Sequence, residues 1–220
     1  MTCPMTDHVH LQTGLCLEDV TLSLGTRRLI KVTREIAPGN ILTVMGDSGS
    51  GKSTLLDFIA GFLDAAFTAQ GRIMLDGEDI THLPPQARKV GLMFQSPLLF
   101  PHMSIEENLL FGLPPANLDR EDRRNLVNAA LDEVGLEGFG ARDPATLSGG
   151  QQTRIALMRL LLAEPRALLL DEPFSSLDQT RRMDIRELVF SKARAKGLPV
   201  LLVTHDAEDA EAAGGDVITL

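Results

Sequence analysis

The segment GDSGSGKST, residues 46–54, has the residue types and spacing of a phosphate-binding loop. It fits the pattern G-x-x-x-x-G-K-[ST] and lies between an apolar run and a helical pattern, the context that this motif requires. The glycines let backbone N–H groups point at phosphate oxygens, Lys52 can reach the β- and γ-phosphates, and the Ser53 hydroxyl can join a Mg²⁺ shell. Because a carboxylate repels phosphate, we expect Asp47 to point outward. The predicted phosphate-binding residues are Gly46, Asp47, Ser48, Gly49, Ser50, Gly51, Lys52, Ser53 and Thr54.

Polar residues end three other apolar runs. Asp171 and Glu172 follow the run ALLL, and the carboxyl ends of strands are where ligands gather in an α/β sheet. Asp171 can hold Mg²⁺ there directly or through water, and Glu172 can act as general base toward the attacking water. His205, after the run VLLV, is expected to contact the γ-phosphate or that water. Gln95, at the end of VGLMFQ, can offer its carbonyl to Mg²⁺ and its amide to water. Taken singly, the acid pair also fits a solvated turn and the histidine a structural residue.

A second segment with the features of an anion site lies much further along the chain. In TLSGGQQTRIALMRLLL, residues 146–162, Ser148 stands where it can cap a helix that begins at two glycines. Such a helix end presents free N–H groups and a positive dipole, and it therefore attracts an anion. One chain thus contains two predicted phosphate-binding ends, although a self-contained nucleotide site needs only one.

The elements that must position these residues alternate between strands and helices. Strands are predicted at residues 15–24, as an edge strand, and within residues 40–46, 71–80, 89–95, 167–170 and 199–203. Helices are predicted at residues 52–62 and 179–197. Residues 96–164 contain prolines and helical patterns but no strand-like run, which indicates a helical insert. This alternation predicts an α/β fold with right-handed crossovers.

The composition is that of an ordinary globular chain. Of 220 residues, 44% are hydrophobic and 23% are charged, and the net charge is −9. This acidic balance argues against binding of nucleic acid, which needs clustered Lys and Arg. No apolar run approaches the roughly 18 residues of a membrane-spanning helix.

Together these motifs resemble the ATP-binding subunit of ABC transporters over essentially the whole chain. Residues 46–54 look like Walker A, Gln95 like the Q-loop glutamine, and LLLDEP like Walker B. LSGGQ, residues 147–151, matches the signature, and its position before DEP is highly specific. SSLD resembles the D-loop and His205 the switch histidine. The resemblance implies an α/β P-loop NTPase (RecA-like) core at residues 1–95 and 165–220, with an N-terminal antiparallel β subdomain and an α-helical subdomain inserted at about 96–164. The whole chain is then a single ABC ATPase domain.

The same resemblance implies how the second anion site is used. Two subunits of such proteins meet head to tail, so that the signature of one covers the γ-phosphate held by Walker A of the other. Ser148, Gly149, Gly150 and Gln151 take that role by resemblance, and Asp178 crosses the dimer interface. ATP and Mg²⁺ are the implied cofactors. The implied partners are a second copy of the chain, integral membrane permease subunits and, indirectly, a solute-binding protein. The implied location is the cytoplasmic face of the cell membrane.

Within the family, MFQSPLLFPHMSIEENL is similar to importers of polyamine, thiamine, sulfate or iron, and GLEGFGARDPATLSGGQ looks closer to YnjD-type ATPases. Phe100, Pro101 and His102 are expected to border the groove that receives the permease, although ordinary packing of the insert also fits them. The alternatives are an ABC exporter and a soluble ABC ATPase outside transport. The chain departs from the family's pattern where adenine binds. It lacks Tyr and Trp, and Leu24 stands where the family stacks adenine on an aromatic residue. Arg27 or Arg28 are candidate substitutes, and nucleotide selectivity is expected to be loose.

Overall fold

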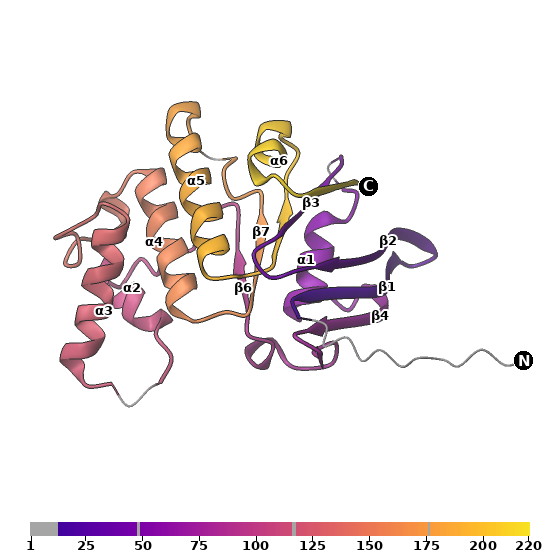
Figure 1. The fold of residues 1–220 in the computed structure, drawn as a ribbon, viewed down its shortest axis with the longest axis horizontal. Coiled ribbons are helices and arrows are strands. Elements are labelled where there is room, and N and C mark those ends of the chain that lie inside the picture. Colours follow the sequence, from indigo (N-terminus) through magenta and orange to yellow (C-terminus); the bar gives the residue numbers. More distant parts are fainter. Residues whose placement is uncertain (1–12, 48, 116–117, 176) are drawn as a thin grey trace, which may run out of the picture.

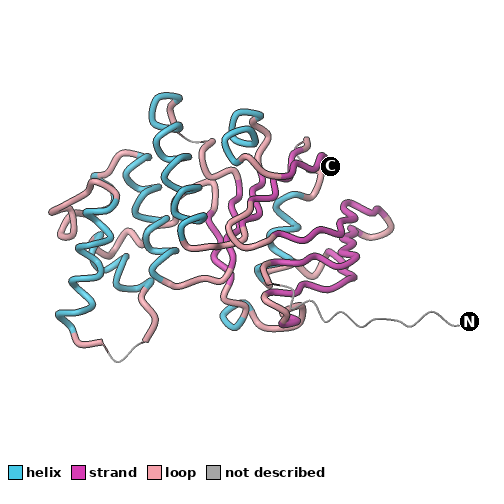
Figure 2. Tube along the Cα trace, viewed as in Figure 1, coloured by secondary structure: helices cyan, strands magenta, loops and turns pink. Residues whose placement is uncertain are grey.

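The computed structural model describes residues 13–47, 49–115, 118–175 and 177–220. It confirms the α/β fold, which contains one antiparallel and one parallel sheet (Figure 1). The antiparallel strands lie to one side of the parallel sheet and most helices lie to its other side (Figure 2). None of the helices in the described ranges is long and apolar enough to cross a bilayer.

The antiparallel sheet has the strand order β2-β1-β4-β5. β1 (Leu15–Leu24) pairs on one side with β2 (Arg27–Ile36) and on the other with β4 (Phe67–Leu75), and β5 (Glu78–Asp79) pairs antiparallel with β4. The prediction that residues 15–24 form an edge strand is therefore wrong. Alternation of buried and exposed side chains indicates which face meets the core but not how many partners a strand has, and β2 is rich in charged residues.

The parallel sheet has the strand order β6-β7-β8-β3-β9. Its strands are β3 (Ile41–Met45), β6 (Val90–Met93), β7 (Ala167–Asp171), β8 (Val200–Val203) and β9 (Asp216–Thr219). All of its pairings are parallel. The segments that follow β3, β6, β7 and β8 therefore emerge at one edge of the sheet, as predicted for the four groups of polar residues.

Six α-helices connect these strands: α1 (Lys52–Ala60), α2 (Ile105–Gly112), α3 (Arg120–Glu133), α4 (Gly149–Leu162), α5 (Gln179–Ala195) and α6 (Ala207–Ala213), with short 3₁₀ turns η1 (Pro85–Ala87) and η2 (Pro144–Thr146), all within the described residues. α2, α3 and α4 come between β6 and β7. A Cβ at Gly112 would lie 2.4 Å from the backbone oxygen of Arg159, so glycine allows α2 to pack directly on α4.

The parallel strands separate two hydrophobic clusters. In β7, Leu168 and Leu170 pack with α2–α5, whereas Ala167 and Leu169 pack with α1 and the antiparallel sheet. Alternate residues of a strand point to opposite faces, so a strand buried on both faces is continuously apolar. This two-sided burial explains why the runs that precede Asp171 and His205 contain no polar residue.

Candidate functional site

The loop after β3 presents backbone N–H groups at the amino end of α1. Gly46, Gly49 and Gly51 have φ angles of 151°, 82° and 98°, which residues other than glycine rarely adopt. Gly51 is the N-cap of α1, and no side-chain hydrogen bond from a described residue caps this helix end. The first-turn N–H groups and the helix dipole therefore make it suited to an anion. The predicted binding residue Ser48 lies outside the described residues.

Lys52 holds its ammonium beside this loop. Its exposed fraction is 7%, and Nζ donates hydrogen bonds to the backbone oxygens of Gly46 and Asp47, each at 2.8 Å. The side chain of Asp47 is exposed, whereas the hydroxyl of Ser50 is buried and has no hydrogen-bond partner among the described residues. Thr54 lies half-buried in the first turns of α1. A phosphate that enters the loop would therefore contact the Lys52 ammonium, and the unpaired Ser50 hydroxyl lies in the same loop.

Ser53 and Asp171 bring two oxygen ligands together. The Ser53 hydroxyl donates to Oδ1 of Asp171 at 3.2 Å, although the two residues are 118 positions apart. Burial raises the pKa of Asp171; the Ser53 hydrogen bond and the charge of Lys52 oppose this rise, and the charge of Glu172 adds to it. A carboxylate that is costly to ionise gains from a nearby divalent cation. One carboxylate and one hydroxyl suit Mg²⁺, which takes few protein ligands and fills its shell with water and phosphate oxygens.

Glu172 and His205 form a pair at the same edge of the sheet. His205 Nδ1 lies 3.1 Å from Glu172 Oε1, and the two side chains are 61% and 24% exposed. The φ angle of Glu172 is 45°, a strained conformation that costs about 1–3 kcal/mol outside glycine. Its backbone is held by a hydrogen bond from Glu172 N–H to the oxygen of Val203 at 2.9 Å and by the Ser175 hydroxyl, which donates to Glu172 O. Strain that is retained by such contacts is typical of a functional position.

Gln95 lies two residues after β6 and is exposed. In the β6–β7 register, Met93 is opposite Leu170, directly before Asp171. Gln95 therefore emerges at the same sheet edge as the acid pair, and no recorded hydrogen bond of the described residues holds its side chain.

Ser148 and Gln151 interact with each other at the start of α4. Ser148 is the N-cap, its hydroxyl accepts from Gln151 N–H at 3.4 Å, and Gln151 Oε1 accepts from Ser148 N–H at 2.9 Å. Gly149 is exposed, and a Cβ there would meet no atom within 4 Å. Gly150 is buried. α4 packs in one hydrophobic cluster and α1 in the other, on opposite faces of the parallel sheet, so within one chain the two predicted anion sites begin helices on different faces.

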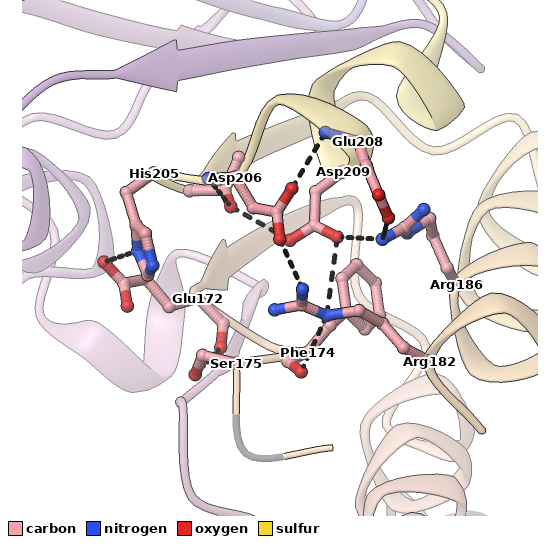
Figure 3. A network of polar contacts seen from close by, with 10 residues as sticks. Glu172, Phe174, Ser175, Arg182, Arg186, His205, Asp206, Glu208 and Asp209 are labelled. Carbon is pink, nitrogen blue, oxygen red and sulfur yellow. Dashed lines mark hydrogen bonds and ion pairs between the residues drawn. The ribbon is translucent and has the colours of Figure 1, made fainter. Parts of the chain in front are cut away.

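Asp178 is exposed and directly precedes α5. The contribution of α5 was not predicted from the sequence: Arg182 and Arg186 of this helix contact the segment after His205 (Figure 3). The sequence did contain a signal for this contact. Arg182 and Arg186 are four positions apart and so share one helix face, and Asp206 and Asp209 are carboxylates of opposite charge.

An apolar groove lies between the end of β6, α2 and α4. Phe94, Leu98 and Phe111 line it and are 41%, 55% and 65% exposed. Arg159 supports the groove, since its Nη2 donates to the backbone oxygen of Leu98 at 2.6 Å and its guanidinium lies 5.0 Å from the centre of the Phe100 ring. Of the residues predicted to border a groove, Phe100 lines this one, whereas Pro101 and His102 are exposed and outside its lining.

Comparisons with known proteins give consistent matches. A family model described as ABC transporter matches residues 29–175. The chain is 49% identical over 199 residues to the "Uncharacterized ABC transporter ATP-binding protein YnjD" of Escherichia coli strain K12, covering 90% of this chain and 91% of that protein. It is 39% identical over 208 residues to the "Fe(3+) ions import ATP-binding protein FbpC" of Brucella abortus strain 2308, covering 94% of this chain but 58% of that protein. The chain thus spans little more than half the length of this iron-import relative.

A solved structure is similar over nearly the whole fold. It is cbiO1 from Clostridium perfringens, described as part of the ABC transporter complex cbiONQ, with a TM-score of 0.82 and 27% sequence identity. The match covers 94% of this chain and 84% of that one. The fold type and the resemblance inferred from the motifs are confirmed by these comparisons.

Proposed function

Since this chain belongs to the ABC transporter family of ATP-binding proteins, we propose that it hydrolyses ATP to drive solute import through separate permease subunits. Family members bind and hydrolyse ATP, and several relatives are named as iron-import ATP-binding proteins. The observation that carries the proposal is the meeting of Lys52, Asp171 and the Glu172–His205 pair at one edge of the parallel sheet.

The nucleotide site we propose consists of residues 46–54 and the acid pair. The loop amides and Lys52 bind the β- and γ-phosphates, and Ser53, Asp171 and Gln95 hold Mg²⁺. When bound, Mg²⁺ neutralises charge that develops on the phosphate oxygens. The adenine base of ATP lies against the end of the β1–β2 hairpin, where Leu24 is 46% exposed and Arg27 and Arg28 are also exposed.

Glu172 is the proposed general base. Its carboxylate accepts a proton from the water that attacks the γ-phosphate, and His205 holds that carboxylate and contacts the γ-phosphate oxygens. A general base of this kind contributes roughly 10²–10⁴-fold to the rate. The strained backbone at Glu172 fixes the direction of its side chain relative to the sheet edge.

The proposed active form is a head-to-tail dimer. Ser148, Gly149, Gly150 and Gln151 of one subunit cover the γ-phosphate bound by the other, and Asp178 lies at the interface. The packing of α1 and α4 on opposite faces of the parallel sheet supports this arrangement, as do the exposure and open surroundings of Gly149. In this proposal residues 96–164 act as a helical subdomain that carries the signature.

The proposed permease contact is the groove lined by Phe94, Leu98 and Phe111. Three exposed apolar side chains in one concave surface are typical of a contact with a protein partner. An apolar segment of a permease fits there and would attach the chain to the inner face of the cell membrane. A solute-binding protein delivers the solute to that permease and does not contact this chain.

Two variants test the proposed function. Glu172→Gln should bind ATP, stop hydrolysis and accumulate as an ATP-bound dimer, whereas exposed Glu137→Gln should behave as wild type. Hydrolysis by Glu172→Gln at the wild-type rate would contradict the assignment. Phe111→Asp should lose co-purification with the permease subunits encoded by neighbouring genes while it retains ATP binding. Leu126→Asp, at an exposed leucine of α3, is the matched control.

A further inference from the structure

A polar network joins α5 to the segment that carries His205 (Figure 3). Arg182 and Arg186 lie one helical turn apart on α5, and they contact Asp206 and Asp209, which flank the start of α6. α5 begins directly after Asp178. The network therefore connects the helix that follows the proposed dimer contact to the residues beside His205.

Arg182 contacts both segments that supply the Glu172–His205 pair. Its Nη1 donates a hydrogen bond to Oδ2 of Asp206, the residue after His205. Its Nε donates to the backbone oxygen of Phe174, two residues after Glu172, at 3.1 Å. The Arg182 side chain is 17% exposed and that of Asp206 is 24% exposed, so water competes little for these contacts.

The residue before His205 is held by the deeper part of the network. The Thr204 hydroxyl donates to Oδ2 of Asp209 at 2.9 Å, and Arg186 Nη2 donates to Oδ1 of Asp209 at 2.6 Å. The side chains of Asp209 and Arg186 are only 1% and 8% exposed. The Thr204 hydroxyl also accepts from Asp206 N–H at 3.1 Å. Both chain neighbours of His205 are therefore fixed.

His205 depends on this support because its own side chain is 61% exposed and packs little. The direction of its ring follows from where its backbone is held. Misplacement of a reacting group by about 1 Å can cost roughly 10²-fold in rate. The planar guanidinium of arginine can satisfy two acceptors at fixed angles, which a lysine cannot do.

We propose that Arg182 is a positioning residue that sets the distance between His205 and Glu172 by binding the segments of both. This inference rests on the proposed roles of Glu172 and His205 in hydrolysis. A purely structural role predicts only that Arg182 stabilises the fold.

Two substitutions separate positioning from folding. Arg182→Ala removes the contacts with Asp206 and Phe174 and also the 3.8 Å ion pair with Asp209. Asp206→Asn removes the charge but retains an oxygen that can cap α6, as Asp206 does for Glu208 N–H at 2.8 Å. The matched control is Arg72→Ala, which removes the exposed ion pair that Arg72 forms with Glu18 at 2.7 Å.

Kinetics of the full chain give the first test. Arg182→Ala and Asp206→Asn should lower kcat about 10- to 100-fold, as expected for a misplaced catalytic pair, with the ATP KM nearly unchanged. Arg182→Lys should restore only part of the loss. In a His205→Gln background, Arg182→Ala should cause a much smaller fall in kcat, because only its contact with the Glu172 segment remains to be lost. An equal fall in both backgrounds would overturn the proposal, because it would mean that Arg182 acts independently of His205.

An NMR experiment on the same full-length chain does not depend on hydrolysis. The ring signals of His205 are assigned by their loss in His205→Gln, and Glu172→Gln should shift them in the otherwise wild-type protein. In Arg182→Ala and in Asp206→Asn, Glu172→Gln should shift them much less. An undiminished shift in both variants would overturn the positioning role. If wild type shows this shift but no ATPase activity, the proposed function fails while the positioning role stands.

Discussion

Ser148 gives the sharpest test of the two-chain nucleotide site, because its local and proposed distant roles can be separated. Locally, Ser148 caps α4 and exchanges hydrogen bonds with Gln151. Ser148→Ala removes the cap, at a cost of about 1 kcal/mol. For a domain of this size, that lowers Tm by about 2–4 °C. Ser148→Asp retains a good cap, so its Tm should remain close to that of wild type.

In the proposed dimer, Ser148→Asp has a second effect, on the partner subunit. A carboxylate at 148 would face the γ-phosphate of the partner's ATP. At about 4 Å, two unit charges repel by about 1 kcal/mol in water and about 4 kcal/mol near a protein surface. Each dimer contains two such sites, so ATP-dependent dimerisation should weaken by about 2–8 kcal/mol, or roughly 30-fold to more than 10⁵-fold.

The assay is sedimentation of each Ser148 variant in the Glu172→Gln background, with and without ATP. The parent and Ser148→Ala should dimerise with ATP, whereas Ser148→Asp should stay monomeric at the same concentration. Calorimetry of the ATP-free samples should show the lower Tm only for Ser148→Ala. Dimerisation of Ser148→Asp at the parent's concentration would refute the position of Ser148 at the partner's phosphate.

Three further predictions concern the nucleotide and metal residues. Lys52→Met should lose most ATP affinity, because two loop carbonyls lose their donor and the phosphates lose a cation; wild-type affinity in a fluorescent-nucleotide assay would contradict this. Leu24→Tyr should tighten ATP binding by about 1–3 kcal/mol through base stacking, and unchanged affinity in the same assay would place the base elsewhere. Asp171→Asn should raise the Tm of the nucleotide-free protein at neutral pH. Burial raises the pKa of Asp171, so the folded state binds its proton more tightly and the ionised form destabilises the fold. That advantage should shrink as pH falls and wild type becomes protonated, and a calorimetric gain that grows toward acid pH would have the wrong sign.

Many residues at the carboxyl ends of the parallel strands could be predicted, because these strands are buried on both faces. The apolar runs before Asp171 and His205 mark such strands, and the loop of residues 46–51 has glycines at positions that require positive φ. Both the buried strands and the glycine loop can therefore be recognised from a few consecutive residues. The pairing of β1 does not follow from local sequence, since its partner β2 is charged along its exposed face.

The support around His205 was missed for a related reason. Arg182 and Arg186 look like surface residues of a charged helix, and α6 is only seven residues long. Their burial arises from the packing of α5 against the segment after β8, which brings together residues 24 positions apart. Long-range pairing of buried charges is a tertiary effect that a periodic pattern does not encode.

In the proposed mechanism hydrolysis requires two chains, because α1 and α4, which begin at the two anion-binding ends, pack on opposite faces of the parallel sheet. The most direct measurement is the ATPase rate per chain over a range of protein concentrations, with the dimer fraction determined by sedimentation under the same conditions. If each nucleotide site needs two chains, the rate per chain should rise in proportion to the dimer fraction. A constant rate per chain at concentrations where only monomers are present would contradict it.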